Sequence, residues 1–344
     1  MTNPRQDIRI ALPSKGRLTE PALQLMADAG LRVHKPNPRQ YQAHIPSLPG
    51  LTVIFQRPND IVVSVRDGSV DFGITGWDVF NEHAHPDGCG VNAAILPLHR
   101  GLGFGQCTLN TIVPENWVAV ETMEDLRERR ESLNRALRVA TKFPNLTAKF
   151  FSQHGFPQVN LIAAEGTLEI APTVGYADLI VDLISTGTTL RDNRLKPLAD
   201  GLILESQACL IANRARLQDS PRVLSTAKHL LEFIVAHLRA SENLALFANM
   251  RGDSPETIAQ KMFTKQVISG LQGPTISPVI TRQGESWYAV HLVVRKDQIA
   301  QAINELRQVG GSGVVVTPVT YIFEEEPQEY RDMLAALEAI DKEC

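Results

Sequence analysis

The chain has 344 residues, a length at which one hydrophobic core usually gives way to two or three domains. Hydrophobic residues make up 43% of the sequence and charged residues 21%, which is typical of a globular protein and excludes a disordered or fibrous chain. The net charge of -4 argues against general nucleic-acid binding, because that activity needs a clustered basic surface. We therefore expect any bound phosphate to be held by a local pocket.

The four cysteines, Cys89, Cys107, Cys209 and Cys344, are scattered, and no pair has the spacing of a metal-binding or redox motif. We interpret them as reduced thiols of a cytoplasmic protein. The first residues contain only a short apolar run before charged residues return, so they do not resemble a signal peptide. Uninterrupted apolar segments long enough to cross a bilayer are missing, and we expect no membrane association.

The first part of the chain alternates between strand and helix patterns. The expected strands are residues 8–13, 51–56 and 71–76, and the expected helices are residues 18–30 and 57–70. This spacing predicts parallel βαβ units with helices covering a sheet. Ligands of such sheets bind at the loops that follow the strands.

Residues 81–105 are rich in glycine and histidine and have weak periodicity, so they predict a loop region with one short strand. His83, His85 and Cys89 are conceivable zinc ligands. A zinc site needs three or four convergent ligands, and no fourth ligand follows at a standard spacing. A solvated loop is the favoured interpretation.

A second α/β series follows. Its expected strands are residues 137–141, 159–166, 178–185 and 208–214, and its expected helices begin near residue 146 and span residues 169–177. The long amphipathic helix over residues 220–241 then marks a domain boundary.

The last part of the chain predicts a separate module. Its expected elements are strand 243–250, helix 254–266, strands 275–281 and 287–294, helix 296–310 and strand 313–323. This βαββαβ order is the ferredoxin-like arrangement, for which regulatory ligand binding or oligomerisation is a common use. The tail, residues 326–344, is expected to be a surface helix.

An apolar strand pattern at residues 179–184 ends in a group of hydroxyl side chains around a glycine. The group comprises Ser185, Thr186, Gly187, Thr188 and Thr189. Backbone N–H groups and hydroxyls that converge at the start of a helix suit a phosphate. A helix N-cap is the alternative interpretation, but a cap needs only one hydroxyl. Asp182 would repel a phosphate unless it faces sugar hydroxyls or Mg²⁺, so a ribose with its 5′-phosphate on the loop fits both features.

Six stretches of the sequence point to one family. They are "IALPSKGRL" (10–18), "RPNDI" (57–61), "DFGITGWDV" (71–79), "LGFGQC" (102–107), "RVATKFPNLT" (138–147) and "YADLIVDLISTGTTLRDN" (176–193). Together they resemble the ATP phosphoribosyltransferases, which catalyse the first step of histidine biosynthesis. The resemblance continues through "GPTISPV" (273–279) and "WYAVHLVV" (287–294) into a C-terminal module like that of the family's long form. The loop at residues 81–101 and the extended tail depart from the family pattern.

The resemblance implies the reaction and the fold. N1 of the adenine of ATP displaces pyrophosphate from C1 of phosphoribosyl pyrophosphate, with Mg²⁺ on the pyrophosphate. The implied α/β fold has two lobes like a type II periplasmic binding protein, an active-site cleft, and a C-terminal ferredoxin-like βαββαβ regulatory domain. The expected bounds are 1–107 with about 195–218 for the first lobe, 108–194 for the second, 219–242 for a connecting helix and 243–344 for the regulatory domain with its tail helix. A homohexamer, with dimers in exchange, is the expected assembly.

The resemblance also assigns residues to sites. Asp182, Ser185, Thr186, Gly187, Thr188 and Thr189 match the family's phosphoribosyl pyrophosphate loop. Lys15, Arg17 and Arg57 follow predicted strands and are candidates for binding phosphates of either substrate, although each could be an ordinary surface charge. Glu169 and Asp178 are candidates for contacts to ribose or base, or else solvated residues. Adenine N1 already carries a lone pair, so no general base is assigned, and alignment with charge stabilisation is the expected basis of catalysis.

A histidine site in the C-terminal module is implied as well. The resemblance places Leu271, Thr275 and Gly313 beside that inhibitor and Asp253 less firmly, whereas these residues by themselves only predict turns. Two other classes of protein remain as alternatives. A solute-binding receptor shares the two-lobe pattern but needs an export signal, and a catalytically silent regulatory subunit would not need both the hydroxyl loop and the C-terminal module.

Overall fold

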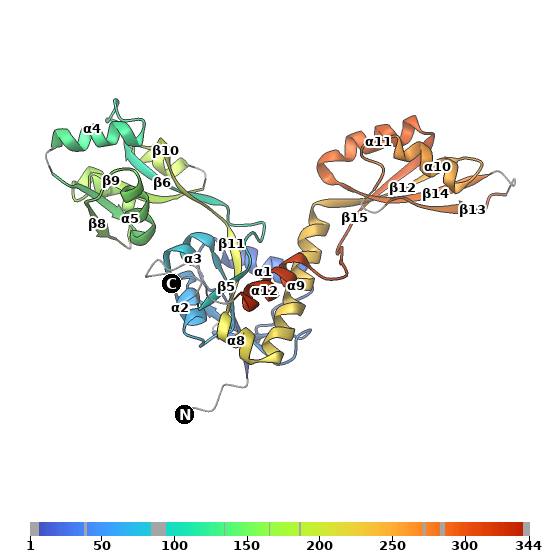
Figure 1. Ribbon diagram of the computed structural model, residues 1–344, viewed down its shortest axis with the longest axis horizontal. Coiled ribbons are helices and arrows are strands. Elements are labelled where there is room, and N and C mark those ends of the chain that lie inside the picture. Colours follow the sequence, from blue (N-terminus) through green and yellow to red (C-terminus); the bar gives the residue numbers. More distant parts are fainter. Residues whose placement is uncertain are drawn as a thin grey trace. The chain divides into compact units, whose positions relative to one another are not determined.

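The computed structural model describes residues 7–37, 40–83, 94–133, 135–164, 166–185, 187–270, 273–282 and 286–339. The chain forms two compact units. The large unit comprises residues 1–27, 31–231 and 328–344, and the small unit comprises residues 28–30 and 232–327. Figure 1 labels many of the helices and strands of both units.

The first lobe of the large unit is built on a six-stranded sheet. Its order is β2 (Gln42–His44), β3 (Leu51–Gln56), β1 (Ile8–Pro13), β4 (Phe72–Gly76), β11 (Ala208–Asn213) and β5 (Ile95–His99). Strands β3, β1 and β4 are parallel, as the βαβ pattern predicts, and β11 is antiparallel to both of its neighbours. The helices of this lobe include α1 (Thr19–Asp28), α2 (Pro58–Arg66), α3 (Trp77–His83) and α8 (Arg214–Asp219).

The second lobe is built on a five-stranded sheet. Its order is β10 (Leu195–Ser206), β6 (Cys107–Pro114), β9 (Leu179–Ile184), β7 (Leu137–Thr141) and β8 (Val159–Ala163). Its helical segments are α4 (Met123–Leu133), α5 (Pro144–Gln153), the 3-10 helix η1 (Leu168–Ile170), α6 (Ala171–Val174) and α7 (Thr188–Asp192). A core that includes Phe151, Phe156 and Leu126 lies on one side of the sheet. Because parallel β7 and β9 both end at the same edge, the loops after them lie close together.

Two segments of the chain cross between the lobes, and backbone hydrogen bonds join them to each other. One crossing runs from β5 to β6 and the other from β10 to β11. The Leu102 N–H donates to the Ala208 carbonyl at 2.9 Å, and the Ala208 N–H donates to the Phe104 carbonyl at 2.9 Å. The two-lobe fold predicted from the sequence is therefore formed, with paired crossings between the lobes.

The small unit contains a four-stranded antiparallel sheet. Its order is β13 (Thr275–Val279), β14 (Trp287–Arg295), β12 (Asn243–Arg251) and β15 (Gly311–Pro318). Helices α10 (Pro255–Phe263) and α11 (Ile299–Gln308) pack on this sheet through a core that includes Leu246, Ile258 and Leu306. The element order βαββαβ and the strand order confirm the predicted ferredoxin-like module.

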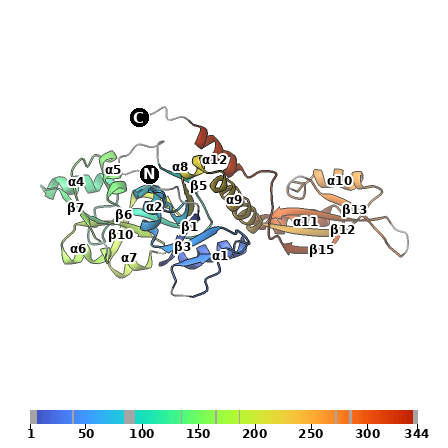
Figure 2. The same ribbon diagram turned by 90° about the horizontal axis from the view of Figure 1, so that it is seen from below.

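Two segments lie outside their expected domains. Residues from about 195 to 206 were predicted to belong to the first lobe, but β10 pairs with β6 in the second sheet through two register shifts. The tail was predicted to belong to the C-terminal domain, but helix α12 (Gln328–Glu338) contacts β5 of the first lobe. In both cases pairing or packing with a distant segment, which no local pattern encodes, decides the placement. Helix α12 lies beside β5 in both ribbon views (Figures 1 and 2).

Helix α9 (Pro221–Ser241) is the long helix predicted at the domain boundary. It begins in the large unit and ends in the small one.

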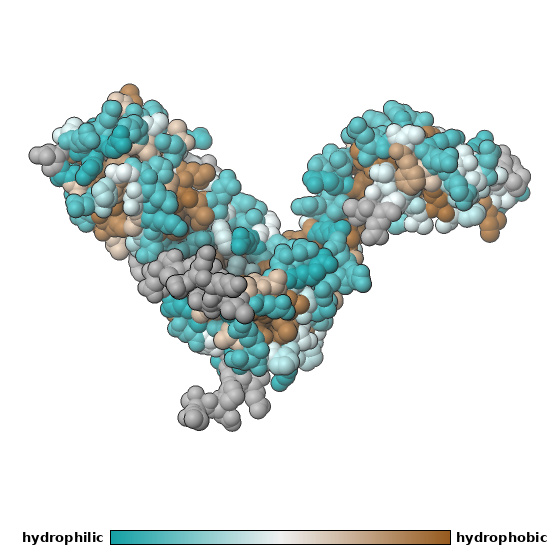
Figure 3. Space-filling model, in the orientation of Figure 1, coloured by the Kyte–Doolittle hydropathy of each residue, from teal (hydrophilic) through white to brown (hydrophobic). Residues whose placement is uncertain are grey.

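The visible face of the molecule is mostly hydrophilic, with smaller hydrophobic patches on each unit (Figure 3). In the described part of the chain, no helix combines the length and apolar character that a membrane span requires.

Candidate active site

The hydroxyl loop follows β9 and begins α7. Gly187 lies at the N-cap position with φ of +73°, a conformation that L side chains rarely adopt. Thr188 and Thr189 form the first turn of α7, and their side chains and that of Ser185 are exposed. Thr186 lies outside the described residues. The loop therefore presents hydroxyls and a helix start to solvent, as a phosphate cradle requires.

Arg17 of the first lobe contacts this loop. It lies in the turn between β1 and α1, and its Nη1 donates to Ser185 Oγ at 3.3 Å. Its Nη2 donates to Cys107 Sγ at 2.8 Å and lies 3.9 Å from the carboxylate of Asp78. A cation from one lobe thus meets the hydroxyl loop of the other, where it could bind an anionic ligand held between them.

Asp182 is half-buried near the end of β9. Its carboxylate accepts the N–H of Leu183 at 2.8 Å. Burial raises the pKa of this carboxyl, while the Leu183 N–H and the charges of Lys142 and Arg17 oppose the rise and that of Glu169 adds to it. Two cations and two carboxylates therefore share this region, and Asp182 has spare acceptor capacity for a ligand.

Asp178 lies at the opposite end of the same strand and has a structural role. Its buried carboxylate accepts Arg135 Nη1 at 2.6 Å and Nη2 at 2.7 Å, and Arg138 Nη2 at 2.8 Å. The Arg138 N–H donates to it as well, at 2.9 Å. Although burial raises the pKa of Asp178, these bonds outweigh burial and lower it well below its usual range. The structure therefore does not bring Asp178, one of the two candidates for contact with ribose or base, to the hydroxyl loop, because its carboxylate is paired with Arg135 and Arg138.

The other candidate residues, Lys15, Arg57 and Glu169, are located by their elements and their exposure. Lys15 is exposed in the same turn as Arg17, and Arg57 is exposed at the N-cap position of α2. Glu169 is half-buried in η1, and its charge helps to raise the pKa of Asp182. Lys15 and Arg57 both follow strands of the first sheet, at the edge where parallel strands place ligands.

Sequence reasoning did not single out three residues of this region. Lys142 follows β7, and its positive charge opposes the rise in the pKa of Asp182. Asp78 is buried, accepts Ser206 Oγ at 2.6 Å and lies beside Arg17. Cys107 was interpreted only as a free thiol, but it contacts Arg17. Lys142 and Asp78 lie within the quoted motifs "RVATKFPNLT" and "DFGITGWDV", which was the available signal.

The predicted inhibitor residues lie in the small unit. The Asp253 carbonyl accepts Tyr288 Oη at 3.5 Å, and exposed Thr275 begins β13 opposite His291. Gly313 has φ of +60° in β15, where a Cβ would lie 3.8 Å from Asn249 Nδ2. Leu271 lies outside the described residues. These positions leave the histidine site a prediction.

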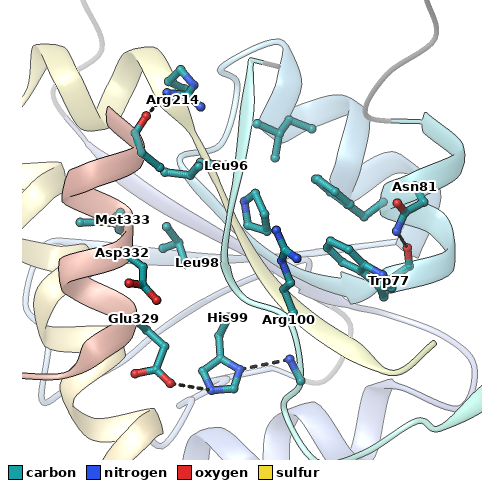
Figure 4. Close-up of a pocket in the computed structure, with 15 residues that line it drawn as sticks. Trp77, Asn81, Leu96, Leu98, His99, Arg100, Arg214, Glu329, Asp332 and Met333 are labelled. Atoms are coloured by element: carbon teal, nitrogen blue, oxygen red, sulfur yellow. Dashed lines mark hydrogen bonds and ion pairs between the residues drawn. The ribbon is translucent and has the colours of Figure 1, made fainter. Parts of the chain in front are cut away.

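A cavity lies elsewhere in the large unit. It has a volume of about 770 Å³ and is lined by α3, β5 and α12. Figure 4 shows Trp77 and Asn81 on one side and Glu329 on the other, with Glu329 paired to His99 at 3.6 Å. None of the predicted site residues lines this cavity. It is therefore separate from the hydroxyl loop.

A metal cluster is not found in the part of the chain that the structure describes. Among those residues, no group of three or more His, Cys, Asp or Glu side chains is placed to hold an ion. His83 belongs to α3, and the other two conceivable zinc ligands, His85 and Cys89, lie outside the described residues.

Comparisons with known proteins agree on one family. A family model described as ATP phosphoribosyltransferase matches residues 57–238. A second model, described as HisG, C-terminal domain, matches residues 240–321. The hydroxyl loop lies within the first match and α12 lies beyond both.

Similar curated proteins carry the same name. ATP phosphoribosyltransferase 2, chloroplastic, of Arabidopsis thaliana is 43% identical over 341 residues, which cover 97% of this chain and 81% of that protein. The ATP phosphoribosyltransferase of Rhodopseudomonas palustris (strain HaA2) is 35% identical over 333 residues, covering 95% and 98%. A solved chain of the ATP phosphoribosyl transferase (HisG:HisZ) complex from Thermotoga maritima matches with a TM-score of 0.51 and 24% identity, covering 66% of this chain and 98% of that one, which supports the fold.

Proposed function

Because the chain belongs to the ATP phosphoribosyltransferase family, as an enzyme of the first step of histidine biosynthesis, we propose the details of its reaction. Adenine N1 of ATP attacks C1 of phosphoribosyl pyrophosphate. The new N–C bond forms as the C–O bond to pyrophosphate breaks, and the products are N1-(5-phosphoribosyl)-ATP and pyrophosphate. The lone pair of N1 makes the new bond, so no side chain has to remove a proton first.

The contact between Arg17 and Ser185 is the observation that carries this proposal. It joins a cation of the first lobe to the hydroxyl loop of the second, at 3.3 Å. A reaction between two polyanionic substrates needs cations and N–H donors fixed on both sides of the reacting atoms. Of the candidate residues, this pair brings a cation of one lobe to a hydroxyl group of the other.

We assign the 5′-phosphate of phosphoribosyl pyrophosphate to the loop of Ser185, Thr186, Gly187, Thr188 and Thr189. Asp182 then accepts hydrogen bonds from the ribose hydroxyls, because its half-buried carboxylate is bonded only locally, to Leu183, in the described contacts. Each charge-assisted hydrogen bond to a phosphate contributes roughly 1.5–3 kcal/mol. Lys15, Arg17 and Arg57 bind the remaining phosphates.

Mg²⁺ is proposed to enter with the pyrophosphate group. The nearby carboxylates of Asp182 and Glu169 are hard oxygen ligands of the kind this ion prefers, and they fit a metal that keeps most of its coordination on the substrate. When bound, the ion neutralises charge that develops on the leaving pyrophosphate. The protein's own part is to hold the ribose and to align N1 with C1.

The test measures pyrophosphate release by the purified full-length protein. We expect release only when ATP, phosphoribosyl pyrophosphate and Mg²⁺ are all present, with a matching amount of the phosphoribosyl-ATP product. Removing the metal with a chelator should stop the reaction. Pyrophosphate release without ATP, or none with all three, would contradict the proposed reaction.

Regulation by histidine is a second proposal, supported by the match of the C-terminal domain to residues 240–321. We place histidine beside Asp253, Leu271, Thr275 and Gly313, in a homohexamer whose inactive form binds it more tightly. Thr275→Leu should raise the histidine concentration for half-inhibition at least tenfold and leave uninhibited turnover within twofold. Unchanged inhibition of the folded variant, or direct competition of histidine with phosphoribosyl pyrophosphate, would contradict this site.

A cytoplasmic location is also proposed, on the basis of the scattered cysteines. The two Arabidopsis relatives are named chloroplastic. Microscopy of a tagged full-length chain in its own cells distinguishes the two compartments.

A further inference from the structure

Helix α3 has two faces with different surroundings. Trp77 and Asn81 line the cavity beside α12 (Figure 4). Asp78 and Glu82 are buried and contact the second lobe, Asp78 through Ser206. Glu82 is 1% exposed, and its contacts are not used by any step of the proposed reaction.

Glu82 is bonded to the start of α5 in the second lobe. Its Oε1 accepts the Asn145 N–H at 2.8 Å, and its Oε2 accepts the Leu146 N–H at 3.0 Å. The Asn145 side-chain amide also donates to the Glu82 carbonyl, at 3.0 Å. Three hydrogen bonds from one residue therefore cross between the lobes.

Helix α5 has no cap of its own at this end. Phe143 lies at its N-cap position without a side-chain hydrogen bond, and Pro144 fills the first turn. The first N–H groups of a helix need acceptors, and a carboxylate also interacts favourably with the positive end of the helix. Glu82 meets both needs from the other lobe.

The start of α5 is tied to the loop that carries Lys142. Thr141 Oγ1 accepts the Phe143 N–H at 2.9 Å, and Thr147 Oγ1 donates to the Phe143 carbonyl at 2.6 Å. Both threonines are fully buried. Lys142 lies between Thr141 and Phe143 and is exposed. Its positive charge opposes the rise in the pKa of Asp182. The position of Lys142 thus depends on how the start of α5 is held.

We propose that Glu82 is a positioning residue for the transfer reaction. From the first lobe it holds the start of α5 and thereby places Lys142 beside Asp182 and the hydroxyl loop. It touches neither substrate. The inference rests on the proposed function, because Lys142 is then a cation that faces the phosphoribosyl pyrophosphate site.

The test compares two carboxylates that accept backbone N–H groups at the start of a helix. Glu82→Gln changes the cap that crosses between lobes. Asp125→Asn is the matched control, because Asp125 Oδ2 accepts the N–H groups of Glu121 at 3.0 Å and Thr122 at 2.8 Å entirely within the second lobe. Both variants replace a carboxylate that accepts two backbone N–H groups with an amide.

We expect both variants to fold and to lose a few degrees of Tm. Glu82→Gln should lower kcat/KM for phosphoribosyl pyrophosphate roughly 10- to 100-fold, because a displacement of about 1 Å in a positioned group has effects of that size. Asp125→Asn should stay within twofold of wild type. Lys142→Met should lower kcat/KM in the wild type but add little to Glu82→Gln, since both changes remove the same placed charge.

Hydrogen exchange of the ligand-free protein supplies a readout that does not depend on activity. Amides of residues 141–147 should exchange faster in Glu82→Gln than in wild type or Asp125→Asn. Unchanged exchange, a kcat/KM within twofold of wild type, or additive effects of Glu82→Gln and Lys142→Met would each overturn the inference. An inactive wild-type protein would instead contradict the proposed function, whatever the exchange result.

Discussion

The two ends of β9 carry aspartates in opposite situations. Asp178 at its start is bonded to Arg135 and Arg138 and has a lowered pKa. Asp182, four residues later, accepts its neighbour's N–H and has a pKa raised by burial. One strand therefore holds a carboxylate whose charge is used inside the fold and another that we propose to contact a ligand.

This difference helps to separate structural from functional acids. Both aspartates lie in one sequence motif, and both were plausible ligand contacts. The ion pairs of Asp178 leave it little capacity to bind anything else, whereas Asp182 lies near the hydroxyl loop and within the influence of the charges of Lys142 and Arg17. A raised pKa beside an accessible hydroxyl loop is the more informative sign of a binding site.

Gly187→Val is expected to have the largest effect. The Val side chain disfavours φ of +73°, and it blocks the close approach of a phosphate to the backbone. We expect kcat/KM to fall about 1000-fold, as for the loss of several fixed donors. Gly175→Val is the control at the other end of β9, because Gly175 has φ of +88° and open space around it. The control should lose similar stability but keep kcat/KM within threefold, and equal losses of activity would erase the contrast between the two ends.

Asp178→Asn should mainly destabilise the fold. Its side chain is 8% exposed and that of Arg135 is 43% exposed, so solvent screens part of the interaction. We expect the free energy of unfolding to fall by about 2–3 kcal/mol, below the range for fully buried pairs. Denaturant unfolding measures this loss, and kcat/KM of the folded variant should remain within twofold. A severe loss of activity at full stability would mean that Asp178 is a site residue after all.

Asp182→Asn should show the reverse pattern. The amide is a weaker acceptor for ribose hydroxyls and a poorer partner for Mg²⁺, so the KM for phosphoribosyl pyrophosphate should rise about tenfold. The KM for ATP should change less than threefold, and stability should not decrease. Initial rates with each substrate varied in turn provide the measurement. Equal increases in both KM values would argue against placing Asp182 on the ribose.

The two aspartates should also respond oppositely to pH, as the smallest of these effects. Asp178, with a lowered folded pKa, contributes stability that is present above its ordinary pKa of 3.8 and is lost as pH falls toward the folded value. Asp182, with a raised folded pKa, costs stability above that value and recovers it as pH falls. From pH 7 to 4, the advantage of wild type over Asp178→Asn should therefore shrink by a few tenths of a kcal/mol, while wild type gains on Asp182→Asn. The free energy of unfolding of wild type and both variants should be measured between pH 7 and pH 4. If the difference from wild type changed with pH in the same direction for both variants, this assignment would be refuted.

Local patterns were sufficient to predict much of the fold. The apolar runs at residues 8–13, 51–56 and 179–184 are strands, and the βαββαβ order of the last module is present. Strands β6 and β10 were not predicted. In β10, Pro197 and Gly201 interrupt the alternation, and two register shifts fit the strand to its partner. Its assignment depends on pairing with a segment about ninety residues earlier.

The candidate site was predicted unevenly for a similar reason. The hydroxyl loop is one continuous stretch, so its residues could be read together. The contacts of Arg17 with Cys107 and of Glu82 with α5 join segments from different lobes. The Arg135–Asp178 pair likewise joins residues 43 positions apart. No spacing rule within one segment reveals which distant charge will be used up by a partner.

The position of β11 has a consequence for how the protein is made. This strand lies between β4 and β5, yet residues 208–213 leave the ribosome after the whole second lobe. The second sheet, from β6 to β10, is continuous in sequence and can form first. Before β11 is synthesised, β4 has an unpaired edge and β5 has no neighbouring strand in the sheet. During that interval the nascent chain can form wrong strand pairs. A stalled chain in which residues up to 207 have emerged from the exit tunnel but residues 208–213 have not should therefore have a folded second lobe and a first lobe that is a target for chaperones and proteases.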